Sequence, residues 1–362
     1  MAVVPVDALL FLHCTVSGVG FSVMGRSSLR EFFAPLLMTA GAVMGWGETV
    51  PAQEVRPRIE ITRVKTEKKF HSAITHHPVV NGWKKASSES FHLIHDLENA
   101  VAEKILRKSE AFRERIQQKW MHPDDNKVPW PDRCSIYLYP SALKEQYAKE
   151  TGVPVTNRGT SKVSIPVHGR VPFREICLYG DPGNIDDVLA HEVGHATTAG
   201  LLRNSTPTPS WVNEGIAVLG EQNDAPMHTR ALAAIQRDAR FSLHEVLTTK
   251  QYPAQRDRHW AFYVQSAQFT EYLWHFDPPS SSTPNLFDKG TQYPLASLDR
   301  RQQEKRRRTL VNFVRDGAND KIGYEAAAKK HYGTTLEQLE ESEEQWRLER
   351  SRRQEVIPVP RR

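Results

Sequence analysis

Every strand-like segment of this 362-residue chain lies in its first half, and the second half shows helical patterns only. Short apolar runs rich in β-branched and aromatic residues predict strands, whereas apolar positions three and four residues apart predict helices. A mixed region followed by helices alone indicates an α+β domain with a helical extension. The predicted strands are 91–95, 134–139, 163–167 and 175–179, and the predicted helices are 97–120, 141–151, 185–202, 211–221, 229–238, 242–248, 260–276, 301–316, 324–332 and 335–352.

The composition excludes several classes of protein. With 39% apolar and 25% charged residues, the chain can bury a core and is not intrinsically disordered. Its 23 prolines and 20 glycines are spread along the sequence, which excludes a long coiled coil. A formal net charge of +5 is small for this length, so the charge does not indicate a nucleic-acid partner.

The N-terminal region has the features of a secretion signal. A basic stretch precedes a long apolar segment, and a small-residue pattern typical of a cleavage site follows that segment. The three parts are Arg26 with Arg30, residues 32–44, and Val50-Pro51-Ala52. We therefore predict that residues 1–52 form a leader and that the protein is exported to the periplasm, the cell envelope or the medium.

The same pattern predicts where translation starts. Counted from Met24 the signal has ordinary proportions, so we predict that Met24 is the true start and that the mature chain begins at Gln53. A transmembrane anchor is the alternative, but neither apolar segment, 8–24 or 32–46, reaches the roughly 18 uninterrupted apolar residues that a spanning helix needs. We expect no stable membrane insertion once the leader is removed.

The cysteines allow two redox states. Cys14 belongs to the predicted leader, so the mature chain retains Cys134 and Cys177. In an exported protein this pair can form one disulfide. Both residues also lie in apolar, strand-like runs, where an unpaired cysteine is an ordinary buried residue. A bridge and two free thiols are therefore both compatible with the sequence.

A histidine pair with helical spacing lies near the centre of the chain. His191 and His195 are four residues apart, so on a helix their side chains lie about 40° apart around the axis and can reach one metal ion. Glu192 projects about 100° from His191, from where it can take a proton from a water molecule that the metal activates. The alternative is a surface helix with two solvated histidines, but the neighbouring residues are apolar and favour a core or cleft.

A third metal ligand is predicted in the next helical segment. Glu214 lies in Trp211-Val212-Asn213-Glu214-Gly215-Ile216-Ala217, after a gap of 18 residues from His195. Its glycine and apolar neighbours are unusual for a glutamate that is merely solvated. Zinc held by three protein ligands keeps one coordination position open for water, as a hydrolytic site requires.

The two motifs, His191-Glu192-x-x-His195 and Asn213-Glu214-Gly215-x-Ala217, resemble those of the gluzincin metallopeptidases, particularly the peptidase MA-like proteins. The resemblance is specific over residues 185–221 and extends loosely to 134–150 and 263–267. It implies a zincin-like α+β fold, in which a small mixed sheet and an active-site helix are followed by a mostly helical part. It also implies that His191, His195 and Glu214 are the ligands of one zinc ion and that Glu192 is the general base and acid. The Gly-x-Met-Glu-Asn sequence of the aminopeptidases is missing, so exopeptidase activity is not implied.

Further site residues are predicted around this group. Tyr263 is the first candidate for stabilising the oxyanion, because the resemblance places it in the helix that follows the active site. His259 and His228 are weaker candidates, and Tyr263 can equally be a core aromatic residue. Asn213 and Glu221 are candidates for orienting the metal ligands, with helix packing or solvation as the alternative.

The predicted organisation has five parts. They are a leader (1–52), an extended lead-in (53–82), a zincin-like catalytic domain (83–276), a loop rich in proline and serine (277–299) and a helical C-terminal extension (300–362). The basic cluster at 300–308 is predicted to be a solvated helix face, and His71, His76 and His77 are predicted to be exposed polar residues.

The predicted function is that of an exported zinc-dependent peptidase acting on peptide or protein substrates, with no nucleic-acid partner. Two alternatives stay open. One is a non-catalytic exported binding module whose metal stabilises its fold. The other is a zinc hydrolase of a non-peptide amide.

Overall fold

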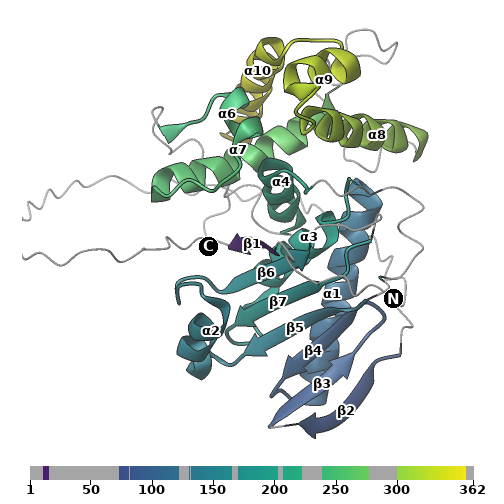
Figure 1. Ribbon diagram of the computed structural model, residues 1–362, viewed down its shortest axis with the longest axis vertical. Helices are drawn as coiled ribbons and strands as arrows, with labels where there is room; N and C mark the ends of the chain where they lie inside the picture. The colour runs from purple at the N-terminus through teal and green to yellow at the C-terminus, as the bar shows by residue number, and fades with distance from the viewer. Residues whose placement is uncertain are drawn as a thin grey trace, which may run out of the picture. The chain divides into compact units, whose positions relative to one another are not determined.

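Seven strands form one mixed sheet in the described part of the chain (Figure 1). In chain order they are β1 (Phe11–Thr15), β2 (Thr75–Val80), β3 (Trp83–Ser87), β4 (Phe91–His95), β5 (Cys134–Tyr139), β6 (Gly159–Ser164) and β7 (Arg174–Tyr179). Across the sheet the order is β1-β6-β7-β5-β4-β3-β2. β5 is parallel to both of its neighbours, β4 and β7, and the other neighbouring pairs are antiparallel. The computed structural model describes residues 11–15, 73–80, 82–121, 130, 132–164, 170–202, 207–221, 239–276 and 300–355.

Helices α1 and α2 lie between strands in the chain, and the other described helices follow the last strand, as the sequence predicts. They are α1 (Asn99–Trp120), α2 (Lys144–Thr151, preceded by the 3-10 turn Ser141–Leu143), α3 (Asp186–Thr198), α4 (Ser210–Gly220), α6 (Leu243–Thr248), α7 (Arg256–His275), α8 (Arg300–Gly317), α9 (Gly323–Tyr332) and α10 (Leu336–Glu355). From α3 onward the described regular structure is helical only, so the chain has the expected α+β class. None of the described helices is long and apolar enough to span a membrane.

The two faces of the sheet bury different residues. In β5 and β7 the even-numbered residues, such as Ile136 and Ile176, pack with α1 and α3. The odd-numbered residues, such as Tyr139 and Cys177, pack with Tyr147 of α2. Because successive side chains of a strand point to opposite faces, the apolar run of each strand supplies both layers. The helix that carries the histidine pair, α3, thus lies directly against the sheet.

A second hydrophobic core joins the end of α1 to the helices after residue 210, and α8, α9 and α10 all contribute to it. Trp211 of α4 lies fully buried in this core, where its Nε1 donates to the Tyr324 hydroxyl of α9 (3.0 Å). The Trp211 ring also packs against Phe269 of α7 and Phe313 of α8. The helices of the region that we predicted as an extension (300–362) therefore share a core with α4 and α7.

The edges of the sheet differ most from the sequence-based expectation. The strand predicted at 163–167 lies earlier, at Gly159–Ser164, because its antiparallel pairing with β7 determines its position. β2, at the end of the predicted lead-in, is exposed at every residue, so it lacks the alternating pattern that identifies a strand. β3 was likewise not predicted.

The other edge strand, β1, lies in the segment that we predict to be removed. β1 pairs antiparallel with β6, with Thr15 opposite Thr160. If the mature chain begins at Gln53, β1 is missing from it and β6 becomes the edge of the sheet. Export and the start at Met24 stay predictions.

Several helix boundaries also differ from the prediction, and those of α3 and α7 differ most. α3 ends at Thr198 rather than Leu202, and the Thr198 carbonyl accepts a hydrogen bond from the Thr208 hydroxyl (2.9 Å). α7 begins at Arg256 rather than Trp260, and Asp257 lies in its first turn, where an acidic residue is favourable. The predicted helix 229–238 and the predicted loop 277–299 lie outside the described residues.

The structure excludes the bridged alternative for the cysteines, since Cys134 and Cys177 are both free and buried. In the β5–β7 register Tyr137 lies opposite Cys177, so Cys134 is offset by three residues along the strand. An odd offset directs the two side chains to opposite faces of the sheet, which a disulfide cannot bridge.

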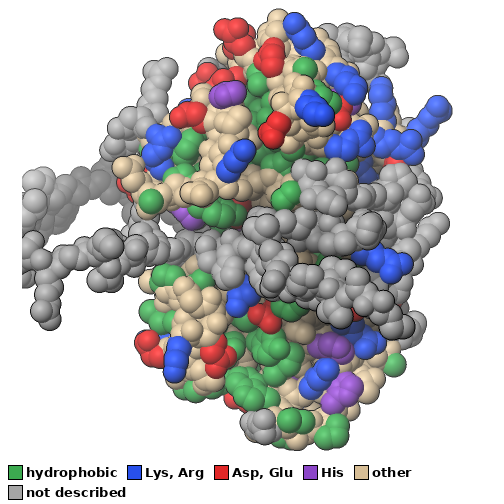
Figure 2. Space-filling view, in the orientation of Figure 1, with side chains coloured by type: hydrophobic (Ala, Val, Ile, Leu, Met, Phe, Trp, Pro, Cys, Tyr) green, Lys and Arg blue, Asp and Glu red, His purple; other side chains and the backbone are tan. Residues whose placement is uncertain are grey.

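The basic cluster on α8 is solvated only in part. Figure 2 shows Lys and Arg side chains gathered on the surface around α8, and Arg301, Lys305 and Arg308 are exposed. Arg306 and Arg307, however, are buried, so the prediction of a wholly solvated face is wrong for these two. Each binds carbonyl groups near the C-terminal end of another helix, where the last carbonyls lack partners within the helix: Arg306 donates to Trp274 O of α7 (3.1 Å), and Arg307 donates to Gln118 O and Lys119 O of α1.

Replacing Arg307 with methionine is expected to lower the free energy of unfolding by about 2 kcal/mol, because two carbonyls lose a charged donor while the apolar stem is kept. Urea denaturation followed by circular dichroism measures this change as a lower midpoint with an unchanged slope. Arg308→Met is the control, because Arg308 pairs with Glu304 (2.6 Å), as Arg307 does, but its side chain is 63% exposed. We expect this substitution to lower the free energy of unfolding by less than about 0.5 kcal/mol. Equal effects of the two substitutions would show that the helix-end contacts do not matter.

Candidate metal centre

Glycines bring α3 and α4 unusually close together. A Cβ atom added to Gly194 would lie 2.7 Å from the Cα of Ala217, so α3 can approach the α4 backbone only without a side chain there. Gly215 allows the same approach between α4 and α7, because a Cβ at this position would lie 2.6 Å from Ser266 O. The glycines of both motifs therefore have a packing role, which is to place His191, His195 and Glu214 within reach of one another.

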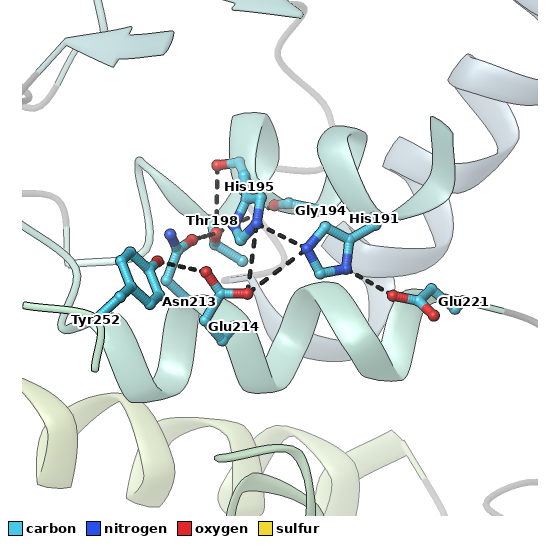
Figure 3. Close-up of polar contacts among 8 residues, drawn as sticks. All are labelled: His191, Gly194, His195, Thr198, Asn213, Glu214, Glu221 and Tyr252. Atoms are coloured by element: carbon cyan, nitrogen blue, oxygen red, sulfur yellow. Dashed lines mark hydrogen bonds and ion pairs between the residues drawn. The ribbon is translucent and has the colours of Figure 1, made fainter. Parts of the chain in front are cut away.

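The donor atoms of His191, His195 and Glu214 converge at one point (Figure 3). The two Nε2 atoms are 3.0 Å apart, and Glu214 Oε2 lies 3.5 Å from that of His191 and 3.6 Å from that of His195. The three residues are 4%, 1% and 0% exposed. This group could hold a metal ion, and it is the one such group of His, Cys, Asp and Glu found among the described residues.

Two of the predicted supporting residues contact the metal-ligand candidates. Glu221 Oε1 lies 2.6 Å from Nδ1 of His191, so the carboxylate fixes the ring and directs Nε2 toward His195 and Glu214 (Figure 3). Asn213 accepts a hydrogen bond from the Thr198 hydroxyl through Oδ1. The side chain of Asn213 also raises the pKa of His195, against the lowering by burial. Its contact with Thr198 connects α4 to the end of α3.

The electrostatics of the group favour a cation. Burial alone would lower the pKa of His191, but the neighbouring carboxylates of Glu214 and Glu221 raise that pKa well above its ordinary value. Burial lowers the pKa of His195 to about 4. Burial would raise the pKa of Glu214, but His195, His191 and Tyr252 hold it well below its usual range. A metal ion must therefore displace a proton from His191, and metal affinity decreases as the pH falls.

Glu192 lies on the same helix, and its carboxyl group lies beside strand β6. A Cβ atom added to Gly159 of β6 would lie 2.9 Å from Glu192 Oε1. Burial raises the pKa of Glu192 to about 8, and the charge of His191 opposes this rise. Glu192 is not one of the three convergent donors, and its role as a general base stays a prediction.

Tyr263 and His259 form an aromatic stack beside His191. The Tyr263 ring is nearly parallel to that of His191, with centroids 5.9 Å apart and planes 8° apart. The His259 ring also stacks on the Tyr263 ring, with centroids 5.2 Å apart. Tyr263 is also buried, and its stacking on His191 places it beside the candidate metal ligands. His228, the third candidate, lies outside the described residues.

Tyr252 is a site residue that the sequence analysis missed. It lies in the segment between α6 and α7, and its hydroxyl donates a hydrogen bond to Oε1 of Glu214 (Figure 3). No spacing or motif links it to Glu214, which is 38 residues away, so only the folded chain reveals the contact.

Other conspicuous features lie away from the three convergent donors. Two surface pockets are lined by residues of α6, α7 and α10 and of their flanking segments, and neither contains His191, His195 or Glu214. His76 and His77 of β2 are exposed, as predicted, and bind Glu103 (3.2 Å) and Ser87 (2.8 Å). His71 lies outside the described residues.

Comparison with known protein families, with curated proteins and with solved structures finds no match for this chain. The resemblance to the gluzincin metallopeptidases therefore stays a prediction from the motifs within residues 185–221 and the looser likeness around them.

Proposed function

We propose that this chain is a zinc-dependent peptidase with a zincin-like catalytic core. The observation that supports the proposal best is the number of donors: His191, His195 and Glu214 converge, and the described residues add no fourth His, Cys, Asp or Glu to the group. Structural zinc sites are closed by four protein ligands, whereas catalytic sites use three and keep one position for water or substrate.

The size of the donor triangle also supports zinc. Zinc–nitrogen and zinc–oxygen bonds are about 2.0–2.2 Å long, and the edge of a tetrahedron is about 1.6 times its centre-to-corner distance, so adjacent ligands lie about 3.4 Å apart. The three edges here are 3.0, 3.5 and 3.6 Å. Two imidazoles and one carboxylate are also a donor set that suits zinc.

Each surrounding residue has a distinct part in the proposed reaction. Zinc, when bound, supplies Lewis-acid polarisation and lowers the pKa of water to about 7. Glu192 accepts the proton of the attacking water and passes it to the leaving nitrogen of the peptide bond. Tyr263, buried beside His191, donates a hydrogen bond to the developing oxyanion. Glu221 holds His191 in the ligating orientation.

A metal-stabilised binding module is the second candidate, and the burial of the site favours it. The exposed fractions of His191, His195, Glu214 and Glu192 are all 4% or less, so a polymeric substrate reaches these side chains only if the covering segments open. We prefer the peptidase because a module that uses its metal only for folding has no use for an open coordination position. A zinc hydrolase of a non-peptide amide would use the same residues and differs only in its substrate.

A peptide-library digest read by mass spectrometry tests the proposal. We expect the full chain with zinc to cleave peptides, and we expect a chelator to abolish cleavage while far-ultraviolet circular dichroism stays unchanged. The Glu214→Ala variant is the matched control, since it is expected to lose the metal and the activity together. Unfolding on chelation, combined with no cleavage by the zinc-loaded chain, would instead favour the binding module. Cleavage of non-peptide amides without any cleavage of peptides would identify the third alternative, a zinc hydrolase of a non-peptide amide.

A further inference from the structure

The two carboxylate oxygens of Glu214 have different partners. Oε2 lies 3.5 and 3.6 Å from the Nε2 atoms of His191 and His195. Oε1 points away from the histidines and accepts a hydrogen bond from the Tyr252 hydroxyl (Figure 3). Glu214 is fully buried, so water does not compete for either oxygen. The carboxylate is therefore held with one oxygen toward the candidate metal position and the other toward Tyr252.

Tyr252 is held in place by aromatic neighbours on α7. Its ring centroid lies 5.5 Å from that of His259, 6.0 Å from that of Phe262 and 6.4 Å from that of Tyr263. Such ring pairs stabilise one orientation of the side chain. The backbone of α7 also lies close to Gly215, the residue after Glu214, since a Cβ atom there would lie 2.6 Å from Ser266 O. The hydroxyl of Tyr252 is thus directed at Oε1 by the same helix that supports Glu214.

We propose that Tyr252 is a positioning residue that makes Glu214 bind the metal through a single oxygen. The inference rests on the proposed function, because it assumes a metal ion at the three donors. A carboxylate can bind a cation through one oxygen or through both. A donor on Oε1 keeps that oxygen occupied, so the protein supplies three donor atoms rather than four and one position stays open for the reaction. Groups that orient metal ligands in this way typically change metal affinity about 10–100-fold.

The test compares the full-length protein with its Tyr252→Phe variant, which keeps the ring contacts and removes only the hydroxyl. The probes are Co²⁺, whose visible absorption is intense in four-coordinate sites and weak at higher coordination number, and Zn²⁺ in a chelator competition. We expect the cobalt absorption of Tyr252→Phe to weaken, because Oε1 becomes free to bind the metal. We also expect its zinc dissociation constant to rise about tenfold. An unchanged cobalt spectrum with an unchanged zinc affinity would overturn the proposal.

Tyr263→Phe is the matched control, since it removes a hydroxyl from the same aromatic cluster without touching the hydrogen bond to Glu214. We expect its cobalt spectrum and zinc affinity to match the wild type and its kcat to fall. If Tyr263→Phe altered the cobalt spectrum as much as Tyr252→Phe, the effect would belong to the cluster and the assignment to Tyr252 would be wrong. If the wild-type protein bound neither metal, the proposed function itself would fail, and this result is distinct from metal binding that is insensitive to Tyr252.

Discussion

Replacing Glu192 with glutamine is expected to lower peptide turnover by about 10³-fold and to leave the bound metal unchanged. The carboxyl group lies beside Gly159 of β6 and is not among the three convergent donors, so the amide should fit without disturbing them. An amide, however, cannot accept the proton of the attacking water. Turnover of a cleaved peptide and metal content by atomic spectroscopy measure the two effects separately.

Glu221→Gln is the matched control for Glu192→Gln, because it makes the same chemical change at the acid that contacts His191 Nδ1 (2.6 Å). It should weaken metal affinity about tenfold and regain most of its turnover at saturating metal. Full turnover of metal-loaded Glu192→Gln would rule out Glu192 as the base.

The pH profile of the wild type gives a second measure of Glu192. Its pKa is raised to about 8 by burial, and a nearby metal cation lowers that pKa again. Because the base must be deprotonated, kcat/KM should rise with pH and level off below pH 8.

The second large effect is expected from Gly194→Ala. The added methyl group would lie 2.7 Å from the Cα of Ala217 and 3.1 Å from its Cβ, and backbone atoms cannot move aside as a flexible side chain can. α3 and α4 must separate, which should destabilise the fold by about 1–3 kcal/mol. Separation also moves the histidines away from Glu214, and a displacement of about 1 Å is expected to lower turnover by about 10²-fold. Thermal unfolding and zinc titration measure the two effects.

Gly200→Ala is the control for this substitution, since its Cβ would have only ordinary contacts, 3.8 Å to Val171 and 3.9 Å to Met121. It should leave zinc affinity unchanged. If Gly194→Ala bound zinc as tightly as Gly200→Ala does, the close crossing of the two helices would not be what brings the donors together.

Much of the fold could be predicted because the buried elements carry their own pattern. The strand at 134–139 matches β5, and the predicted helices at 211–221 and 324–332 match α4 and α9 to within one residue at each end. The edge strands could not be predicted in the same way. β2 is exposed throughout, and the position of β6 depends on its pairing with β7, so neither has a hydrophobic period that identifies its bounds.

The site shows the same division between local and long-range information. His191 and His195 follow from helical spacing, and Glu214 from its company of glycine and apolar residues, so the convergent group could be named in advance. Tyr252 and the buried arginines of α8 could not. Their partners are distant in sequence, and a tyrosine or an arginine is equally common in solvated segments. The packing role of Gly194 likewise depends on which helix lies opposite, which only the tertiary structure determines.

Trp211 has a consequence for the architecture of the whole chain. It begins the motif that ends in Glu214, and it is enclosed by Phe269, Phe313 and Tyr324 from three later helices. These residues lie as far as 113 positions after Trp211, so α7, α8 and α9 help to position α4 and with it the candidate ligand Glu214. Any shortened form of this protein intended for assays therefore has to retain α8 and α9, although their sequences contain none of the predicted site residues.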